Sequence, residues 1–591
     1  MPQNRRKVAF SGKKKKEQIQ AHRKRKAQRH AEEDNESCGN QYEEKQFYGE
    51  SSLATPLQDS SGYFHRDVQA VNQQPGGNSR ANRYNLKFRK ATSAEKEKRK
   101  ALHSRPVEML PDLELENDIE CFYPPGLSYP SRPPWKKNMT KSELDMSENR
   151  YFRLFCEQID KNFADRDLSL YELNLETWRQ LWRVTEMSDI LLVIVDARFP
   201  VALFPPYLYH HLVEKENKGV ILIMNKCDLL PASVVLAWER YFCEKFPKLL
   251  VVPFSSMEGK KSKKSLLRMA AESALSLVDA CQKLVDGEVS LDSWRSKIEE
   301  ERNSENEINE TEGCEVAETQ IITAQSTVPE IYHRFRDGIL TLGTIGHPNV
   351  GKSSLINALM GKKVVSVSKT PGHTKHFQTI FLTKNIKLCD CPGLVFPSTV
   401  DMPLQVLLGS FPIAQVRDPI SIAHYIAQRL DVPRILKLSQ LEDMDNSEWT
   451  SYFICKAWAE KRGYHTRSRG VADVSRAANE LLRFSLNGFK SLIIYLRPPG
   501  FTQEKKNIEA DPCIERIRLI QGTHASDTLQ NEEEEINLEK EETSQNASSS
   551  DGEDSAPEAA SEDEKEEKEE CEEENKPSVA YQNKYALLDC D

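Results

Sequence analysis

A glycine-bearing octet, residues 346–353, has the residue types that bind nucleotide phosphates. An apolar run at 339–345 predicts a buried strand before it, and apolar side chains at helical spacing predict a helix after it. Glycines let successive backbone N–H groups converge on phosphates, the ammonium of Lys352 adds charge at the outer phosphates, and the Ser353 hydroxyl suits Mg²⁺. The contacts predicted in this loop are Gly346, His347, Pro348, Asn349, Val350, Gly351, Lys352, Ser353 and Ser354.

An earlier tetrad, residues 225–228, follows a second apolar run at 220–224 and could recognise a base. A carboxylate at Asp228 can accept from both N1–H and the exocyclic amine of guanine, whereas adenine offers no donor at N1. Adenine would leave this buried carboxylate unpaired, so the tetrad favours guanine. A third apolar run at 249–252 precedes two serines that fit a loop beside the base. The base contacts predicted in these two loops are Asn225, Lys226, Asp228, Ser255 and Ser256.

Two further segments could complete a site for phosphoryl transfer. Residues 370–374 look like the segment that lends a threonine, here Thr374, to Mg²⁺ and the outer phosphate. A predicted strand at 386–389 ends before Asp390, which would hold Mg²⁺ through water, and the amide of Gly393 would sense the γ-phosphate. The predicted catalytic residues are Lys352, Thr374 and Gly393, the predicted Mg²⁺ ligands are Ser353, Thr374 and Asp390, and the further nucleotide contacts are Asp390, Pro392 and Gly393.

The order of these parts is unusual, because the base-reading tetrad precedes the phosphate loop by roughly 120 residues, the reverse of an ordinary GTPase. Over residues 150–500 the chain resembles the circularly permuted GTPases related to nucleostemin and the large-subunit GTPase, with further matching segments at 178–183, 196–198 and 412–418. The resemblance implies an α/β fold: a permuted P-loop GTPase domain, with a mixed sheet flanked by helices, followed by a small helical domain. It also implies that Arg198 anchors a loop and that GTP and GDP bind.

Composition shifts divide the chain into five regions. We expect a basic, largely disordered region at 1–105 with some helices, a proline-rich strap at 106–145, the permuted G domain at 146–398, a helical domain at 399–500 and a disordered acidic tail at 501–591. An acidic linker at 286–330 would rejoin the original ends of the rotated G domain. Apolar spacing predicts helices at 142–155, 173–187, 231–246, 260–284, 402–408, 422–430, 452–461 and 473–484.

The charge distribution suggests partners. The net charge of -10 conceals a basic segment at 1–30, which could bind RNA, act as a nuclear or nucleolar address, or simply be solvated. A second basic stretch at 83–100 carries Tyr84 and Phe88, which could stack on bases or pack against the G domain. The residues Arg462, His465, Arg467 and Arg469 could likewise form an RNA-facing loop or a solvated one. Together with these basic segments, the resemblance implies rRNA or a pre-ribosomal particle as partner.

Other classes of protein are disfavoured. The 13 cysteines include no Cys-x-x-Cys pair, so neither a zinc site nor a disulfide framework is indicated. The longest apolar run, 190–195, is too short to span a bilayer, and the first ten residues lack the apolar core of a signal peptide. We expect a monomeric, intracellular protein of nucleus, nucleolus and cytoplasm, with no membrane partner.

The weak point for catalysis is Leu394, which stands where Ras-like enzymes carry a water-orienting Gln. The resemblance implies slow hydrolysis until a ribosomal partner or K⁺ completes the site, and Asn349 matches the K⁺ ligand of such GTPases. A shift at Gly393 on hydrolysis would pull on the first turn of the helical domain. Three functions stay open: a GTPase switch in ribosome assembly, a GTP-holding scaffold with negligible turnover, and an RNA-binding protein with a structural nucleotide.

Overall fold

The computed structural model describes residues 97–521, apart from 99, 137, 164–167, 257–265, 304–332, 368–377, 443–447, 467–469 and 489–491, together with two short strands, β1 (Val68–Ala70) and β2 (Lys87–Arg89). The basic segment at 1–30 and Tyr84 lie outside these residues, and Phe88 lies in β2. None of the described helices combines the length and the apolar character needed to cross a membrane.

One six-stranded sheet forms the centre of the G domain, in the order β5-β4-β3-β6-β8-β7. Its strands are β3 (Ile190–Asp196), β4 (Gly219–Asn225), β5 (Leu250–Pro253), β6 (Leu340–Ile345), β7 (Gln378–Thr383) and β8 (Ile386–Asp390). All neighbouring pairs are parallel except β7 and β8. β3 and β6 are buried along their whole length, as expected of parallel strands covered on both faces.

The sheet joins the two stretches that the chain order separates. β6 lies between β3 and β8, with Val193 opposite Ile345 in the parallel register of β3 and β6. The carboxyl ends of β3, β4, β6 and β8 therefore meet at one edge, where ligands bind in open α/β sheets. This topology confirms the predicted mixed-sheet, permuted α/β fold.

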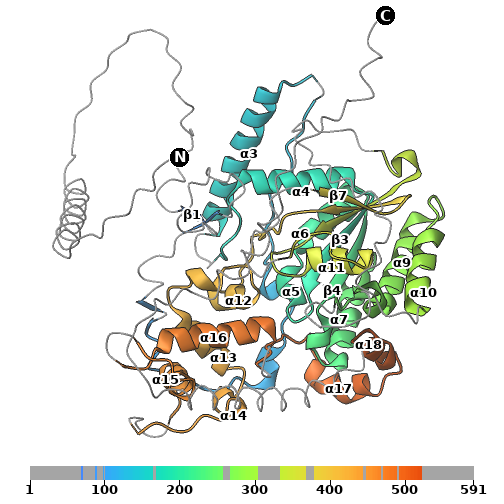
Figure 1. Ribbon diagram of the computed structural model, residues 1–591. Coiled ribbons are helices and arrows are strands. Elements are labelled where there is room, and N and C mark those ends of the chain that lie inside the picture. The colour runs from blue at the N-terminus through green and yellow to red at the C-terminus, as the bar shows by residue number, and fades with distance from the viewer. Residues whose placement is uncertain are drawn as a thin grey trace, which may run out of the picture. The chain divides into compact units, whose positions relative to one another are not determined.

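Helices flank the sheet on both faces (Figure 1). Trp178 and Leu181 on α4 are fully buried, so this helix, predicted at 173–187, packs on the sheet. The helices of this domain are α3 (Lys141–Asn162), α4 (Leu175–Met187), α5 (Pro200–Leu203), α6 (Pro206–His210), the π-helix η3 (His211–Lys215), α7 (Ala232–Lys245), α8 (Leu266–Met269), α9 (Ala271–Val285), α10 (Asp292–Asn303) and α11 (Lys352–Met360), with 3₁₀ turns η4 (Cys227–Leu229) and η5 (Arg336–Gly338).

Helix α3 begins earlier and ends later than its sequence pattern predicts. The N-cap is Thr140, whose hydroxyl accepts from the amide of Glu143 while the Glu143 carboxylate accepts from the amide of Thr140. This is a capping box, which satisfies two amides that the first turn leaves without helical partners. The helix predicted at 142–155 therefore starts one residue earlier, at Lys141, and extends to Asn162.

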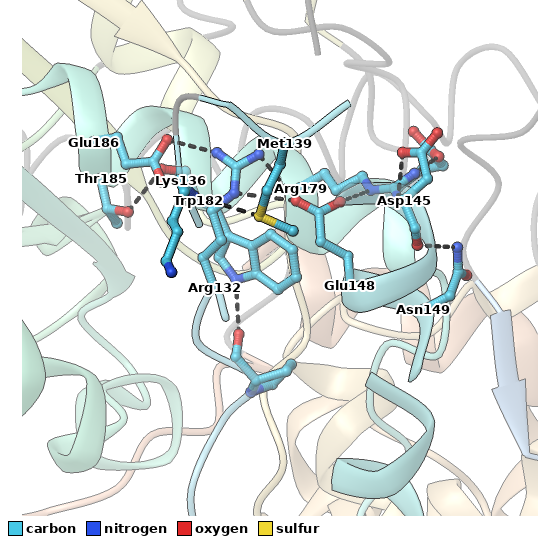
Figure 2. A network of polar contacts seen from close by, with 12 residues as sticks. Arg132, Lys136, Met139, Asp145, Glu148, Asn149, Arg179, Trp182, Thr185 and Glu186 are labelled. Atoms are coloured by element: carbon cyan, nitrogen blue, oxygen red, sulfur yellow. Dashed lines mark hydrogen bonds and ion pairs between the residues drawn. The ribbon is translucent and has the colours of Figure 1, made fainter. Parts of the chain in front are cut away.

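A network of buried charges attaches the proline-rich strap to α3 and α4 (Figure 2). The carboxylate of Glu148, 2% exposed, accepts from Arg132 of the strap at 3.0 Å and from Arg179 of α4 at 2.7 Å. Arg132 also donates to Glu186 at 2.7 Å, and Arg179 to Asp145 at 3.0 Å. Each buried charge thus has an opposite partner, which such burial requires. The strap also contains η1 (Asp112–Leu115) and η2 (Ile119–Cys121).

Part of the predicted acidic linker is ordered. Residues 292–303 form α10, which packs on α9 through Trp294 and Ile298, both fully buried. The expectation of an aperiodic segment from 286 onward is therefore wrong at its start. Two apolar residues spaced by four are enough to pack a helix against an existing core. Among acidic neighbours, however, two such residues do not form an apolar pattern from which a helix could be predicted.

The helical domain follows the sheet. It contains α12 (Met402–Leu407), the 3₁₀ turn η6 (Ile413–Gln415), α13 (Pro419–Ala427), α14 (Val432–Ile435), α15 (Ser451–Lys461) and α16 (Val474–Asn487). The predicted N-cap Asp473 accepts from the amide of Arg476, and Ala477, Ala478, Leu481 and Leu482 form the buried stripe. Helices α13, α15 and α16 pack on one another.

The structure restricts the predicted RNA-facing loop in this domain. Arg462 donates to the carboxylate of Glu480 at 3.0 Å, which also accepts from Trp458 at 2.7 Å and Tyr464 at 2.9 Å. Arg462 is thus held by a structural cluster instead of being presented to a phosphate. Arg467 lies outside the described residues, as does Arg469.

Two helices continue into the region predicted to be a disordered tail. They are α17 (Phe501–Glu509) and α18 (Cys513–Gln521), which pack on α7 (Figure 1). Ile514, Ile517 and Ile520 supply the buried face of α18. The prediction of disorder is therefore wrong for residues 501–521, and the residues from 522 onward lie outside the described part of the chain.

Candidate nucleotide-binding site

The phosphate loop runs from the end of β6 to the start of α11, and its glycines are required by close packing. A Cβ on Gly346 would lie 2.3 Å from the carbonyl oxygen of Ile194 in β3. A Cβ on Gly351, whose φ is +96°, would lie 2.2 Å from Nδ2 of Asn225. Only glycine fits at either position. The glycines therefore let the loop lie directly against the strand and the tetrad that precede it in sequence.

The base-reading tetrad is hydrogen-bonded to the phosphate loop. Asn225 Nδ2 donates to the carbonyl oxygen of Val350 at 2.8 Å. Lys226 Nζ donates to the carbonyl oxygen of Asn349 at 2.7 Å. These two bonds bring the two motifs, separated in the chain, to one edge of the sheet and allow one nucleotide to contact both. The structure therefore places two of the predicted segments side by side, and the nucleotide contacts at them stay predictions.

Asp228 and the serine loop form the base-facing side of the site. Ser255 Oγ donates to Asp228 Oδ1 at 2.9 Å, and Ser255 and Ser256 are both buried. Asp228 itself is exposed, which differs from the buried carboxylate expected above. The difference arises because Asp228 sits in the short turn η4 at the rim of the sheet. A bound base would have to cover this carboxylate for the selection of guanine to operate.

Lys352 is buried within the phosphate loop. Its Nζ donates to the carbonyl oxygens of Gly346 at 3.0 Å and His347 at 2.6 Å. Burial lowers the pKa of Lys352 to about 8, and the nearby charge of Asp390 opposes that change. Phosphate oxygens placed beside the ammonium would favour its charged form. The geometry therefore suits a lysine that neutralises phosphate charge.

The carboxylate of Asp390, at the end of β8, fits the predicted role in holding Mg²⁺. Ser353 Oγ lies 3.5 Å from Asp390 Oδ2, and Gln378 Nε2 lies 3.3 Å from the same oxygen. Asp390 Oδ1 is buried and has no hydrogen-bond partner among the described residues. Burial raises the pKa of Asp390, against the opposing charge of Lys352. Hydroxyl and carboxylate oxygens are the ligands that Mg²⁺ prefers.

The turn after β8 is held against the phosphate loop. A Cβ on Gly393 would lie 2.7 Å from Cα of Pro348, so only glycine allows this approach. The amide of Leu394 donates to the carbonyl oxygen of Gly346 at 3.2 Å, and the Leu394 side chain is buried. Leu394 is therefore part of the core and cannot orient a water. The remaining predicted contacts, His347, Val350, Ser354 and Pro392, are buried in the same two segments, and Thr374 lies outside the described residues.

Two residues in the phosphate loop also contact the helical domain. Asn349 Nδ2 donates to the carbonyl oxygen of Gly409 at 2.9 Å, and Asn349 has a positive φ of 59°. His347 Nδ1 lies 3.2 Å from Ser410 Oγ, and burial lowers the pKa of His347 to about 3, so the ring is neutral. The predicted K⁺ ligand is thus bonded through its nitrogen to the segment after α12.

An ion pair at the end of β3 anchors the site to α16, and sequence analysis did not place it in the site. Asp196 Oδ2 accepts from Lys226 Nζ at 2.8 Å and from Arg198 at 2.8 Å. Arg198 also donates to the carbonyl oxygens of Ser485 at 2.8 Å and Leu486 at 3.1 Å. The one sequence feature that could have indicated this ion pair is the Asp-Ala-Arg segment at the end of a predicted buried strand. Asp196 thus holds the lysine of the base-reading tetrad in place.

We expect the Arg198→Met substitution to lower the free energy of unfolding by about 3 kcal/mol, because it leaves a buried carboxylate with one cation. Burial opposes ionisation of Asp196, but Arg198 and Lys226 outweigh it and hold its pKa well below the usual range. A depressed pKa contributes stability above the unfolded-state value of about 4, and this contribution is lost as the pH falls. The difference in the free energy of unfolding between Arg198→Met and the unsubstituted protein should therefore become smaller below about pH 4.

Urea unfolding across this pH range tests the prediction. The matched control is Arg295→Met, which removes an exposed arginine paired with Asp279 and should change stability by less than about 1 kcal/mol. A pH-independent difference for Arg198→Met would show that lost packing, and not the ion pair, determines the effect.

A phosphate loop, a base-reading tetrad and an Asp-x-Pro-Gly turn at one edge of a mixed sheet define a P-loop GTPase whose chain order is circularly permuted. The family model described as "50S ribosome-binding GTPase" matches residues 341–433. Guanine nucleotide-binding protein-like 1 of Homo sapiens is 41% identical over 500 residues, covering 79% of this chain and 82% of the relative. The chain belongs to the same family of GTP-binding proteins.

More distant proteins also match. GTPase LSG1-2 of Arabidopsis thaliana is 32% identical over 438 residues, covering 70% of each chain. The solved structure of GNP-bound YlqF from T. maritima is 17% identical and covers 55% of this chain and 99% of that chain, with a TM-score of 0.32.

Proposed function

We propose that this protein hydrolyses GTP slowly to GDP and phosphate and acts as a nucleotide-dependent switch in assembly of the large ribosomal subunit or a related RNA–protein particle. The observation that carries the proposal is the pair of hydrogen bonds from Asn225 and Lys226 to the phosphate loop, because they build one guanine-nucleotide site from two separate stretches. The ribosomal part is supported by the name of the matching family model.

The chain's own residues supply most of what phosphoryl transfer needs. Lys352 and the loop amides would neutralise charge on the phosphates, and the amide of Gly393 would sense the outer phosphate. Mg²⁺, when bound, would neutralise charge shared by the β- and γ-phosphates, and Ser353, Asp390 through water, and Thr374 would hold it. Because Leu394 is buried, no residue at its position orients the attacking water, which supports a low intrinsic rate.

We further propose that the Asn349 side-chain oxygen is a ligand for K⁺, since its amide nitrogen is already fixed on Gly409. A monovalent cation there would neutralise transition-state charge in the manner of an arginine finger. We also propose rRNA or a pre-ribosomal particle as partner and a location in nucleus, nucleolus and cytoplasm, both supported by the basic segment at 1–30. We propose a monomeric state as well.

The buried Leu394 also favours a second function, a GTP-binding scaffold with negligible turnover. Single-turnover hydrolysis with and without large ribosomal subunits separates the two. For the switch, we expect a rate increase of at least about tenfold with subunits, since completing the charge arrangement of such sites contributes 10³–10⁵ elsewhere. No increase, together with unchanged co-sedimentation in GDP and in a non-hydrolysable GTP analogue, would favour the scaffold. Equal single-turnover rates of GTP hydrolysis in KCl and in NaCl would contradict the proposal that Asn349 is a ligand for K⁺.

A further inference from the structure

Gln521, the last residue of α18, is hydrogen-bonded to the turn that carries Asp228. Gln521 Nε2 donates to the carbonyl oxygen of Cys227 at 2.9 Å and to that of Leu230 at 2.8 Å. These carbonyls flank Asp228, the carboxylate that would read guanine. Gln521 is 9% exposed, so water does not readily replace its hydrogen bonds. One amide group thus fixes both ends of the turn that carries the specificity-determining side chain.

The C-terminal end of α16 packs against the same turn. Gly488 is the C-cap of that helix, with a φ of +73°, and a Cβ there would lie 2.9 Å from Cδ2 of Leu229. The neighbouring carbonyls of Ser485 and Leu486 hold Arg198, which in turn holds Asp196. The base-reading turn is therefore enclosed between the ends of two helices that come from the C-terminal part of the described chain.

Helix α18 is itself fixed on α7, which begins two residues after Leu230. Its apolar face is buried, and Arg516 forms an ion pair with Glu239 of α7. Helix α18, which carries Gln521, and the turn that Gln521 contacts are therefore both attached to α7, and Figure 1 shows α18 beside α7. A side chain on such a base can set the position of the turn to within a fraction of an ångström, which recognition of a base requires.

We propose that Gln521 is a positioning residue for guanine recognition, which holds the 227–230 turn so that Asp228 faces the N1 and exocyclic amine edge of the base. The inference rests on the proposed function as a guanine-nucleotide-binding protein. Asp228 is exposed in η4, a turn of three residues, so its direction depends on the backbone around it as well as on the hydrogen bond from Ser255. The base, and not the phosphates, is the part of the nucleotide that Gln521 affects.

The test compares GDP with IDP, whose hypoxanthine lacks the exocyclic amine. Gln521→Met keeps the length of the side chain but removes the donor, and Gln521→Glu keeps polarity while placing an acceptor against two carbonyls. We expect the affinity for GDP to fall about tenfold, the usual effect of one lost buried hydrogen-bonding group. The affinity for IDP should fall less, so the ratio of the two dissociation constants should move towards one. The single-turnover rate at saturating GTP should stay unchanged.

Leu519→Ala is the matched control, because Leu519 lies on the same helix and is 66% exposed. Thermal unfolding of each full-length variant identifies a general loss of stability, which would not alter the GDP to IDP ratio. An unchanged ratio in folded Gln521 variants would overturn the inference, and so would failure of both to fold, since Gln521 would then be a structural residue. If the unsubstituted protein bound no GDP, the proposed function itself would fall instead.

Discussion

Substitution of Asp228 by Asn should reduce the affinity for GTP by roughly 10³-fold, somewhat less than the 10⁴–10⁵ of fully desolvated sites that recognise a polar group. The carboxylate can accept from two guanine donors, whereas the Asn amide places one N–H group against them. Affinity for XTP should increase, because xanthine carries an oxygen at the position of the exocyclic amine. Competition binding with GTP and XTP measures both changes.

The control for this substitution is Asp337→Asn, which removes the same charge from a carboxylate that is 78% exposed and lies in η5. It should leave both affinities within about twofold, as expected of surface changes. Unchanged GTP affinity in Asp228→Asn would mean that the base is read elsewhere, and the assignment of the tetrad would be wrong.

Substitution of Lys352 by Ala should reduce single-turnover GTP hydrolysis by about 10²–10³-fold, the typical effect of removing one preorganised charge-stabilising group. The loss of affinity should be largest for GTP, smaller for GDP and smallest for GMP, because the ammonium acts at the outer phosphates. Lys352 is 7% exposed, so water cannot fully replace its charge. Hydrolysis under single-turnover conditions and displacement of a fluorescent GDP measure these effects.

Lys362→Ala is the matched control, because this exposed lysine lies just beyond the end of α11. Its removal should leave hydrolysis within about twofold. Equal losses of affinity for GMP and GTP in Lys352→Ala would show that the lysine supports the loop, through its bonds to Gly346 and His347, without acting on the outer phosphates.

The sheet and the motifs could be predicted because each depends on a local pattern. The apolar run at 190–195 is too uniformly hydrophobic for anything except a covered strand, and the octet at 346–353 combines glycines, a lysine and a serine in the order that a phosphate loop needs. The reversed order of the motifs was equally visible, because the sheet brings strand ends together irrespective of their order along the chain.

What could not be predicted depends on contacts between distant segments. Gln521 follows an ordinary amphipathic helix at the edge of an acidic tail, and only the fold brings it to Cys227. Trp294 and Ile298 were hidden among acidic residues, where two apolar positions do not make a recognisable pattern. The exposure of Asp228 also depends on the rim of the sheet, which sequence patterns do not describe.

The segment after Gly393 has a consequence for how a signal would leave the site. The amide of Glu172 donates to the carbonyl of Val395 at 3.0 Å, that of Ser169 to Ser398 at 2.9 Å, and that of Thr399 to Phe122 at 2.9 Å. Before it reaches α12, this segment is thus bonded to the stretch between α3 and α4, through Ser169 and Glu172, and to the strap, through Phe122. If GTP hydrolysis displaces this segment, we expect the strap to move with it, because the two are joined by the hydrogen bond between Thr399 and Phe122.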